Sequence, residues 1–330
     1  MFWGQYLAMA IVTLSNVRKR FGSTIALDGI DLTIAQPHIF GVVGPDGAGK
    51  TTLLRILVGL LDFEASTATV LDYDIRTQTQ TLRRSLGYVP QTFSLYPDLT
   101  VQHTLEFFAD VHGLSRAAFR ARMAELLALS QLERFLTFSV GSLSGGMKQK
   151  LALICALLHQ PRLLILDEPN NGVDVIARGD MWAILRQLQS VTIVISTGYL
   201  DEAERCDELI YLYKGRIRVQ GSPGEIKASF PWQTYRFPDD LAPAAITKLR
   251  QALWVRQVRL VAGTLLVTTL LSRTELPAAV HGLLSREIRI EAVDPPLELI
   301  FAELTEQAEH GQDMKQGEKS PLASFATARQ

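Results

Sequence analysis

The sequence has few cysteines, no excess of either charge and no long apolar run. Its two cysteines, Cys155 and Cys206, show no CxxC or Cys/His spacing, so they predict isolated thiols in a reducing compartment rather than a disulfide or a metal site. The 33 Lys and Arg residues are balanced by 34 Asp and Glu residues, which leaves no global basic field to attract nucleic acid. Because no apolar run approaches the roughly 20 residues of a membrane-spanning helix, we expect the chain to reach a membrane only through a partner.

The length and the apolar pattern predict two domains. A chain of 330 residues is long for a single core and suits one large domain with a smaller one. Over residues 11–221, short Val-, Ile- and Leu-rich runs alternate with amphipathic helical patterns, which predicts an α/β domain. Residues 1–10 lack the features of a signal peptide, and we expect them to be an extension outside this domain. Three runs are apolar enough to be strands buried on both faces of a sheet: residues 39–43, 163–166 and 192–196.

Residues 222–306 differ in pattern and predict a small α+β domain. The expected elements are strand 234–237, helix 242–253, strands 255–260 and 264–270, a helix from Glu275 and strand 287–293. This βαββαβ order is typical of a ferredoxin-like domain. The polar sequence of residues 307–330 predicts a disordered tail.

A glycine-rich segment after the first buried run carries the strongest functional signal. The pattern GxxxxGK[ST] is matched by Gly44, Pro45, Asp46, Gly47, Ala48, Gly49, Lys50 and Thr51. In such a loop, backbone N–H groups and a helix N-terminus face phosphate oxygens, a lysine reaches the outer phosphates and a hydroxyl is offered to Mg²⁺. Thr52 extends the expected ATP-binding segment into the helix predicted over residues 53–61. A glycine-rich turn with an accidental lysine is the alternative, and the loop by itself also suits a kinase, a GTPase or a motor.

A second candidate anion site lies at residues 143–147. Ser144, Gly145 and Gly146 precede a helical run over residues 150–159, and the N-terminus of a helix attracts anions. One outer phosphate does not need two such sites from one chain, so we expect Ser144, Gly145 and Gly146 to contact a nucleotide bound by a partner. The alternative is an ordinary helix-capping loop.

Two carboxylates, Asp167 and Glu168, follow the apolar run 163–166. A carboxylate pair at the end of a buried strand is costly unless a metal ion or a proton transfer uses it. The alternative, two solvated acids at a strand end, ignores the glycine-rich loop in the same chain.

With the glycine-rich loop, residues 143–147 and this carboxylate pair in order, the chain resembles the ATP-binding subunits of ABC transporters over about residues 11–221. The resemblance implies a P-loop NTPase cassette with a helical subdomain at about residues 92–160. It further implies a head-to-tail pair of cassettes that encloses two ATP molecules. Within each site, Asp167 would hold Mg²⁺ and Glu168 would polarise the attacking water.

Other residues take roles from the resemblance. Gln91 is similar to the glutamine that senses the outer phosphate, so it joins Glu168 and Lys50 as an expected catalytic residue and joins Thr51 and Asp167 as an expected Mg²⁺ ligand. Without the resemblance, Gln91 is an ordinary loop residue. Phe21 is similar to the aromatic residue that stacks on adenine, although an aromatic residue near a strand end also suits a core position.

The sequence also departs from the family pattern. Asn170 and Val175 replace a threonine and a proline in the loop that crosses to the opposite site, which puts the geometry of that loop in doubt. Gly198 stands where the family usually has a histidine that contacts the outer phosphate. Losing one well-placed transition-state donor costs on the order of 10² to 10³ in rate, so we expect ATP binding with slow hydrolysis.

Residues 95–101 and 294–305 resemble the ATPases of ABC-2-type exporters, including drug and polyketide exporters. The resemblance implies ABC-2-type permease subunits as partners and a peripheral position on the cytoplasmic face of the cell membrane. The second cassette is either an identical copy or, as Gly198 favours, a different cassette with an efficient site. Two alternatives stay open: an ATP-binding structural subunit whose partner hydrolyses ATP, and a soluble ABC protein acting on ribosomes or DNA, although such proteins usually join two cassettes in one chain.

Overall fold

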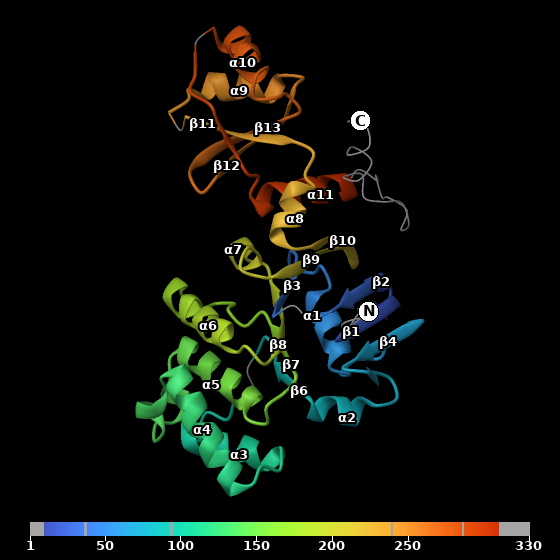
Figure 1. Cartoon of the computed structure of the whole chain (residues 1–330), viewed down its shortest axis with the longest axis vertical. Helices are drawn as coiled ribbons and strands as arrows, with labels where there is room; N and C mark the ends of the chain where they lie inside the picture. Colours follow the sequence, from blue (N-terminus) through green and yellow to red (C-terminus); the bar gives the residue numbers. More distant parts are fainter. Residues whose placement is uncertain (1–9, 36–37, 93–94, 239, 286, 310–330) are drawn as a thin grey trace, which may run out of the picture. The chain divides into compact units, whose positions relative to one another are not determined.

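The computed structural model describes residues 10–35, 38–92, 95–238, 240–285 and 287–309. The chain divides into two compact units, residues 1–220 and 221–330, which Figure 1 colours from blue to yellow-green and from yellow to red. The extension expected at residues 1–10 falls almost entirely outside the described residues.

A six-stranded sheet forms the centre of the first unit. Its strand order is β10-β9-β3-β8-β7-β6, and the neighbouring pairs from β9 to β6 are parallel. The strands are β3 (Ile39–Val43), β6 (Leu86–Val89), β7 (Leu163–Asp167), β8 (Thr192–Thr197), β9 (Glu208–Tyr213) and β10 (Arg216–Gly221). Every residue of β3 and β7 is buried, which explains why these strands are near-continuous apolar runs in the sequence.

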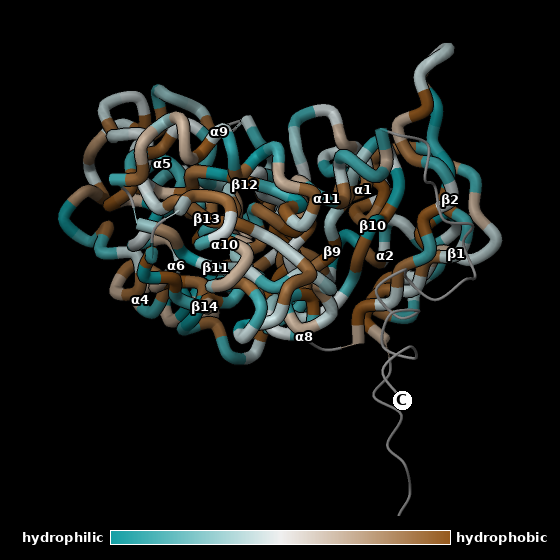
Figure 2. Tube along the Cα trace, turned by 90° about the horizontal axis from the view of Figure 1, so that it is seen from above, coloured by the Kyte–Doolittle hydropathy of each residue, from teal (hydrophilic) through white to brown (hydrophobic). Residues whose placement is uncertain are grey.

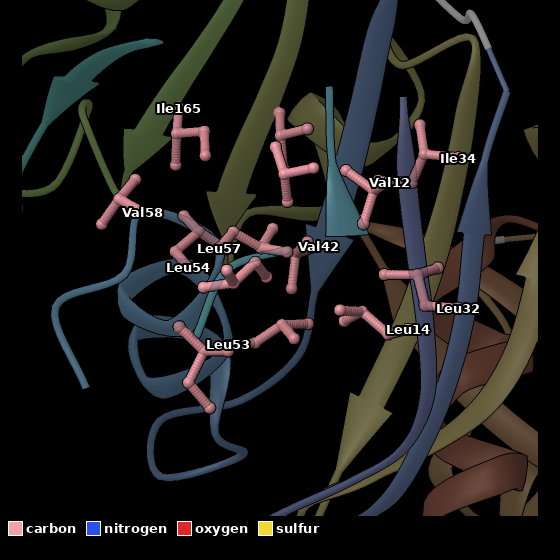
Figure 3. Close-up of a cluster of buried hydrophobic side chains, with 14 of the residues drawn as sticks. Val12, Leu14, Leu32, Ile34, Val42, Leu53, Leu54, Leu57, Val58 and Ile165 are labelled. Atoms are coloured by element: carbon pink, nitrogen blue, oxygen red, sulfur yellow. The ribbon is translucent and has the colours of Figure 1, made fainter. Parts of the chain in front are cut away.

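A second, antiparallel sheet packs beside the first. Its order is β2-β1-β4-β5, and its strands are β1 (Val12–Phe21), β2 (Thr24–Ile34), β4 (Thr67–Val70) and β5 (Tyr73–Asp74). Helix α1 (Lys50–Leu57) shares one hydrophobic core with both sheets. Figure 3 shows Leu53, Leu54 and Leu57 of α1 facing Val42 of β3 and Ile165 of β7.

Helix α1 begins and ends earlier than the predicted range of residues 53–61. Gly49, with φ at 107°, caps its N-terminus, so the helix includes the polar residues 50–52 that an apolar pattern does not reveal. The helix ends before Gly59, whose φ of 68° is incompatible with a right-handed helix.

The remaining helices of the first unit lie between the strands of the six-stranded sheet in the chain. They are α2 (Thr79–Arg84), α3 (Val101–Val111), α4 (Arg116–Ser130), α5 (Gly145–Leu157), α6 (Val175–Gln187) and α7 (Leu200–Ala203). Helices α3, α4 and α5 contact one another and gather together in Figure 1. They occupy the range in which the sequence predicted a helical subdomain.

The second unit contains a four-stranded antiparallel sheet of order β12-β13-β11-β14. Its elements follow the expected βαββαβ order, with one helix before and one after it. They are α8 (Pro223–Ala228), β11 (Gln233–Phe237), α9 (Pro243–Gln251), β12 (Val255–Val261), β13 (Thr264–Thr269), α10 (Leu276–Leu284), β14 (Glu291–Val293) and α11 (Leu297–Glu309). Its classification as a ferredoxin-like domain stays a prediction.

Two boundaries predicted for the second unit are wrong. Strand β14 begins at Glu291 rather than at residue 287, because its pairing with β11 starts only at Arg236 opposite Glu291. The tail predicted from residue 307 begins inside α11, which continues to Glu309. Gln307 Nε2 donates a hydrogen bond to Glu303 Oε1 at 3.0 Å one turn earlier, and this side-chain contact supports the last turn.

Hydropathy follows these elements along the chain. Figure 2 shows hydrophobic segments, in brown, within strands and helices and hydrophilic segments, in teal, in many of the loops. None of the helices in the described ranges is both long and apolar enough to span a bilayer.

Candidate functional site

The glycine-rich loop joins β3 to α1 at the carboxyl edge of the parallel sheet. A Cβ atom on Gly44 would lie 2.2 Å from the carbonyl oxygen of Leu212, so the loop passes against the end of β9 only because this residue is glycine. Gly49 has a φ of 107°, and a Cβ there would lie 2.6 Å from the carbonyl oxygen of Ala26. These close contacts explain why the motif requires glycine at positions 44 and 49.

The side chain of Lys50, the first residue of α1, folds back against the glycine-rich loop. Its ammonium donates hydrogen bonds to the carbonyl oxygens of Gly44 at 2.8 Å and Pro45 at 3.0 Å. Its Nζ also lies 2.9 Å from Glu168 Oε1, and the two side chains are only 4% and 12% exposed. Three acceptors therefore compensate a nearly desolvated cation at the place where the sequence predicts the outer phosphates.

Asp167 at the end of β7 is fully buried. Its Oδ1 accepts hydrogen bonds from Thr51 Oγ1 at 3.0 Å and Ser196 Oγ at 2.8 Å, while its Oδ2 is buried without a hydrogen-bond partner. Burial raises the pKa of Asp167, and the hydrogen bonds from Ser196 and Thr51 act in the opposite direction. An orphaned carboxylate oxygen beside a threonine hydroxyl fits a hard cation that prefers oxygen ligands.

The sparse protein contribution to this site fits Mg²⁺ in particular. The described contacts at this position comprise one carboxylate, from Asp167, and one hydroxyl, from Thr51. Mg²⁺ usually keeps several waters and takes one or two carboxylates together with substrate phosphates rather than a cage of protein ligands. Thr51 and Asp167, together with Gln91 as the third expected ligand, would supply the protein's share.

Glu168 follows Asp167 in a left-handed conformation, with φ at 46°. Its N–H donates to Ser196 Oγ at 2.8 Å, and its Oε2 accepts hydrogen bonds from Gln91 Nε2 at 2.8 Å and from Asn171 Nδ2 at 3.3 Å. A left-handed non-glycine residue costs on the order of 1–3 kcal/mol and persists only where its surroundings hold it. The structure thus brings together Lys50, Gln91 and Glu168, the three expected catalytic residues.

Two expected contacts lie outside this group. Ser144 caps α5, with its Oγ accepting from the N–H of Met147 at 3.3 Å, and both Ser144 and Gly145 are exposed. Helix α5, which Ser144 caps, stands apart from helix α1 and its glycine-rich loop in Figure 1. This separation suits the expectation that Ser144 and Gly145 face another molecule. Phe21 at the end of β1 is 48% exposed, so it is not a core residue, and Lys19 Nζ lies 5.1 Å from its ring centroid.

Sequence reasoning missed two residues that position Glu168. Ser196 links the N–H of Glu168 to Asp167, and Asn171 contacts the Glu168 carboxylate. Ser196 is the first polar residue near the end of a buried apolar strand, which is a signal that could have identified it. Asn171 carries no comparable signal in the sequence.

Gly198 lines a cavity of about 300 Å³ that also includes Glu168. The nearest atom to a Cβ built on Gly198 is the carbonyl oxygen of Gly44 at 3.6 Å. Gly198 is not among the residues with positive φ, so a Cβ atom at this position makes only an ordinary contact and causes no backbone strain.

Comparisons with known proteins show which proteins the chain is similar to. Residues 27–171 match the family model described as ABC transporter. The chain is 43% identical over 218 residues to the probable multidrug ABC transporter ATP-binding protein YbhF of Escherichia coli K12, which covers 65% of this chain and only 38% of that protein. It is 39% identical over 220 residues to the Nod factor export ATP-binding protein I of Burkholderia orbicola, which covers 66% of this chain and 72% of that protein.

A solved structure extends the comparison to the fold. It is a dimeric ATP-binding cassette in a post-hydrolysis state, bound to ADP and Pi, and it superimposes with a TM-score of 0.58 at 27% identity. The match covers 64% of this chain and 98% of that chain.

We predict that Gly44→Ala lowers both thermal stability and nucleotide affinity. A methyl group 2.2 Å from the Leu212 carbonyl oxygen forces the loop away from β9 and displaces the carbonyl oxygens that hold Lys50. Gly179→Ala is the matched control, because a Cβ there has no atom within 4 Å and alanine favours a helix interior by roughly 0.5–1 kcal/mol. Thermal unfolding and titration with a fluorescent ATP analogue measure both effects. Equal behaviour of the two variants would contradict the close approach of the loop to β9.

Proposed function

The chain belongs to the ABC transporter family of ATP-binding proteins, and we propose that it binds and hydrolyses ATP to drive an ABC-2-type membrane exporter. The observation that carries the proposal is the meeting of Lys50, Glu168 and Asp167 at one edge of the sheet, with an orphaned oxygen on Asp167. The Nod factor export protein and the probable multidrug protein among its relatives support export as the process.

The residues of the loop bind the nucleotide in this proposal. Backbone N–H groups of residues 44–49 and the Lys50 ammonium contact the phosphates, Thr52 lies in the first turn of α1, and the exposed Phe21 ring stacks on the adenine. Thr51, Asp167 and Gln91 would hold Mg²⁺, which supplies charge neutralisation at the phosphates when it is bound.

Glu168 accepts a proton from the attacking water. Its carboxylate is shared between Lys50, Gln91 and Asn171, so phosphate oxygens that compete for Lys50 free one carboxylate oxygen for the water. Gln91 keeps the other oxygen oriented. Through Lys50, binding of an outer phosphate therefore controls whether the Glu168 carboxylate is free to accept a proton.

The exposed Ser144 and Gly145 give the chain its partner-facing site. We propose that they contact a nucleotide bound by a second cassette, and that ATP-driven closure of the pair moves ABC-2-type permease subunits. The chain would lie on the cytoplasmic face of the cell membrane, attached through those subunits. Nucleic acid has no role in this proposal.

A second candidate function is an ATP-binding subunit whose partner performs most of the hydrolysis. Gly198 favours it, because no side chain from this position reaches the cavity beside Glu168. Glu168 favours the first candidate, because the proposed proton acceptor is present and oriented. The two candidates differ in which site of the cassette pair turns over.

We predict that Glu168→Gln retains ATP binding and slows hydrolysis by about 10² or more, since an amide cannot accept the proton of the water. Lys50→Ala should instead lose most of the ATP affinity. Glu133→Gln, a change of the same kind at an exposed residue, is the control. Binding by equilibrium titration and turnover by phosphate release separate the two effects. Unchanged turnover of the Glu168 variant in the assembled complex would contradict its role.

We predict that Gly198→His raises hydrolysis by about 10- to 10²-fold, because it adds a side-chain donor beside Glu168. The absence of positive φ and the open space at this position allow the change without loss of folding. Gly198→Leu adds bulk without a donor and should give no increase. Turnover of both variants is measured, and circular dichroism checks that they fold. If the rate of hydrolysis rises in both variants or in neither, Gly198 is not what limits hydrolysis.

For the cassette pair, we predict that Ser144→Arg reduces the activity of the reconstituted complex more than Lys50→Ala does. In a heterodimer, Ser144 closes the partner's efficient site, while Lys50 serves the slow site that contains Gly198. Loss of a helix cap itself costs about 1 kcal/mol. Ser115→Arg controls for it, because Ser115 caps α4 through the same type of hydrogen bond, at 3.3 Å to the N–H of Ala118. Equal or reversed damage from Ser144→Arg and Lys50→Ala would favour a homodimer.

A further inference from the structure

The cavity beside Glu168 has an acidic lining. The end of β8, helix α7 and the loops that follow β3 and β7 form its wall. Its volume of about 300 Å³ is well above the roughly 10–15 Å³ that a cavity needs to hold one water molecule. Asp46, Glu168 and Glu202 are among its lining residues, and no Lys, Arg or His is among the described residues that line it. Lys50 balances Glu168 from the side of the loop.

Glu202 is buried without a cationic partner. It is 1% exposed, and its carboxylate accepts hydrogen bonds from Asn170 Nδ2 at 2.8 Å and Thr197 Oγ1 at 2.5 Å. Both donors are neutral, and within the described ranges no Lys, Arg or His forms an ion pair with Glu202. Buried carboxylates are rarely left in this state unless another group supplies the opposite charge.

Asn170 provides an unused acceptor on the same wall. Its side chain is 1% exposed, and its Oδ1 is buried with no hydrogen-bond partner. The amide cannot be turned round to remove this feature, because Oδ1 would then face the Glu202 carboxylate, acceptor against acceptor. The cavity wall therefore carries one buried oxygen without the donor that buried polar groups normally have, next to a buried carboxylate that has only neutral donors.

We propose that this cavity is a binding site for a small cationic N–H donor of the imidazolium or guanidinium class. Such a molecule donates a hydrogen bond to Asn170 Oδ1 and forms an ion pair with Glu202. Its planar imidazolium ring or guanidinium group enters through the space that Gly198 leaves open. The bound donor would lie beside the Glu168 carboxylate, where it adds positive charge next to the proposed reaction centre.

The test measures binding of imidazole and guanidinium chloride to the full chain without nucleotide, by ligand-observed NMR. We expect saturable binding to the unsubstituted chain and to Gly198→Ala, whose added Cβ makes only an ordinary contact of 3.6 Å with Gly44. Gly198→Leu fills the cavity and should weaken binding at least about tenfold. Sodium acetate, an anion of similar size, should not bind.

A second variant separates charge from shape. Glu202→Gln keeps the size of the side chain but removes its charge, so guanidinium binding should weaken about tenfold or more while the fold, followed by circular dichroism, is retained. No saturable binding to the unsubstituted chain, equal binding to Gly198→Leu, equal binding to Glu202→Gln or equal binding of acetate would each overturn the proposal.

The effect of the donor on hydrolysis is a separate arm that rests on the proposed ATPase function. Imidazole should stimulate turnover of the unsubstituted chain and of Gly198→Ala, and it should leave Gly198→Leu unchanged. Binding without stimulation retains the site and removes its link to catalysis. Absence of ATP hydrolysis in every condition contradicts the proposed function and leaves the binding result as an independent test of the site.

Discussion

The ion pair between Lys50 and Glu168 is the interaction on which the rest of the site depends. Its two atoms lie 2.9 Å apart in nearly complete burial, so each charge would be costly without the other. Lys50 follows β3 and Glu168 follows β7, and both strands pair in parallel with β8. The carboxyl ends of these strands meet at one edge of the sheet, which is where open α/β sheets bind their ligands.

Several unfavourable features collect around this pair. Gly44 is pressed against the Leu212 carbonyl group, Glu168 has a left-handed backbone, and Asp167, like Asn170, has a buried oxygen without a partner. Such features persist where function requires them and where a well-packed scaffold compensates for them. Here the scaffold is the core between α1 and the two sheets, in which every residue of β3 and β7 is buried.

Two of the three departures from the family pattern, Gly198 and Asn170, meet in one cavity. Seen in the sequence they are 28 positions apart and look unrelated. In the structure they open and line the same space beside Glu168, with Glu202 buried next to Asn170 at 2.8 Å. The missing side chain at Gly198 therefore changes the local electrostatics, because the acidic lining of the cavity faces no donor from that position.

The sequence by itself determined the P-loop, the carboxylate pair and the buried parallel strands, because each of these depends on residues that are adjacent in the chain: glycines that permit a tight turn, a lysine at a helix start, and apolar runs that only a doubly covered sheet can bury. The tertiary structure alone decided the contacts of Ser196, Asn171 and Glu202, the start of β14 at Glu291, and the helical end of α11. Those features depend on which distant segments pair or pack together, and local patterns do not encode the partners that long-range packing supplies.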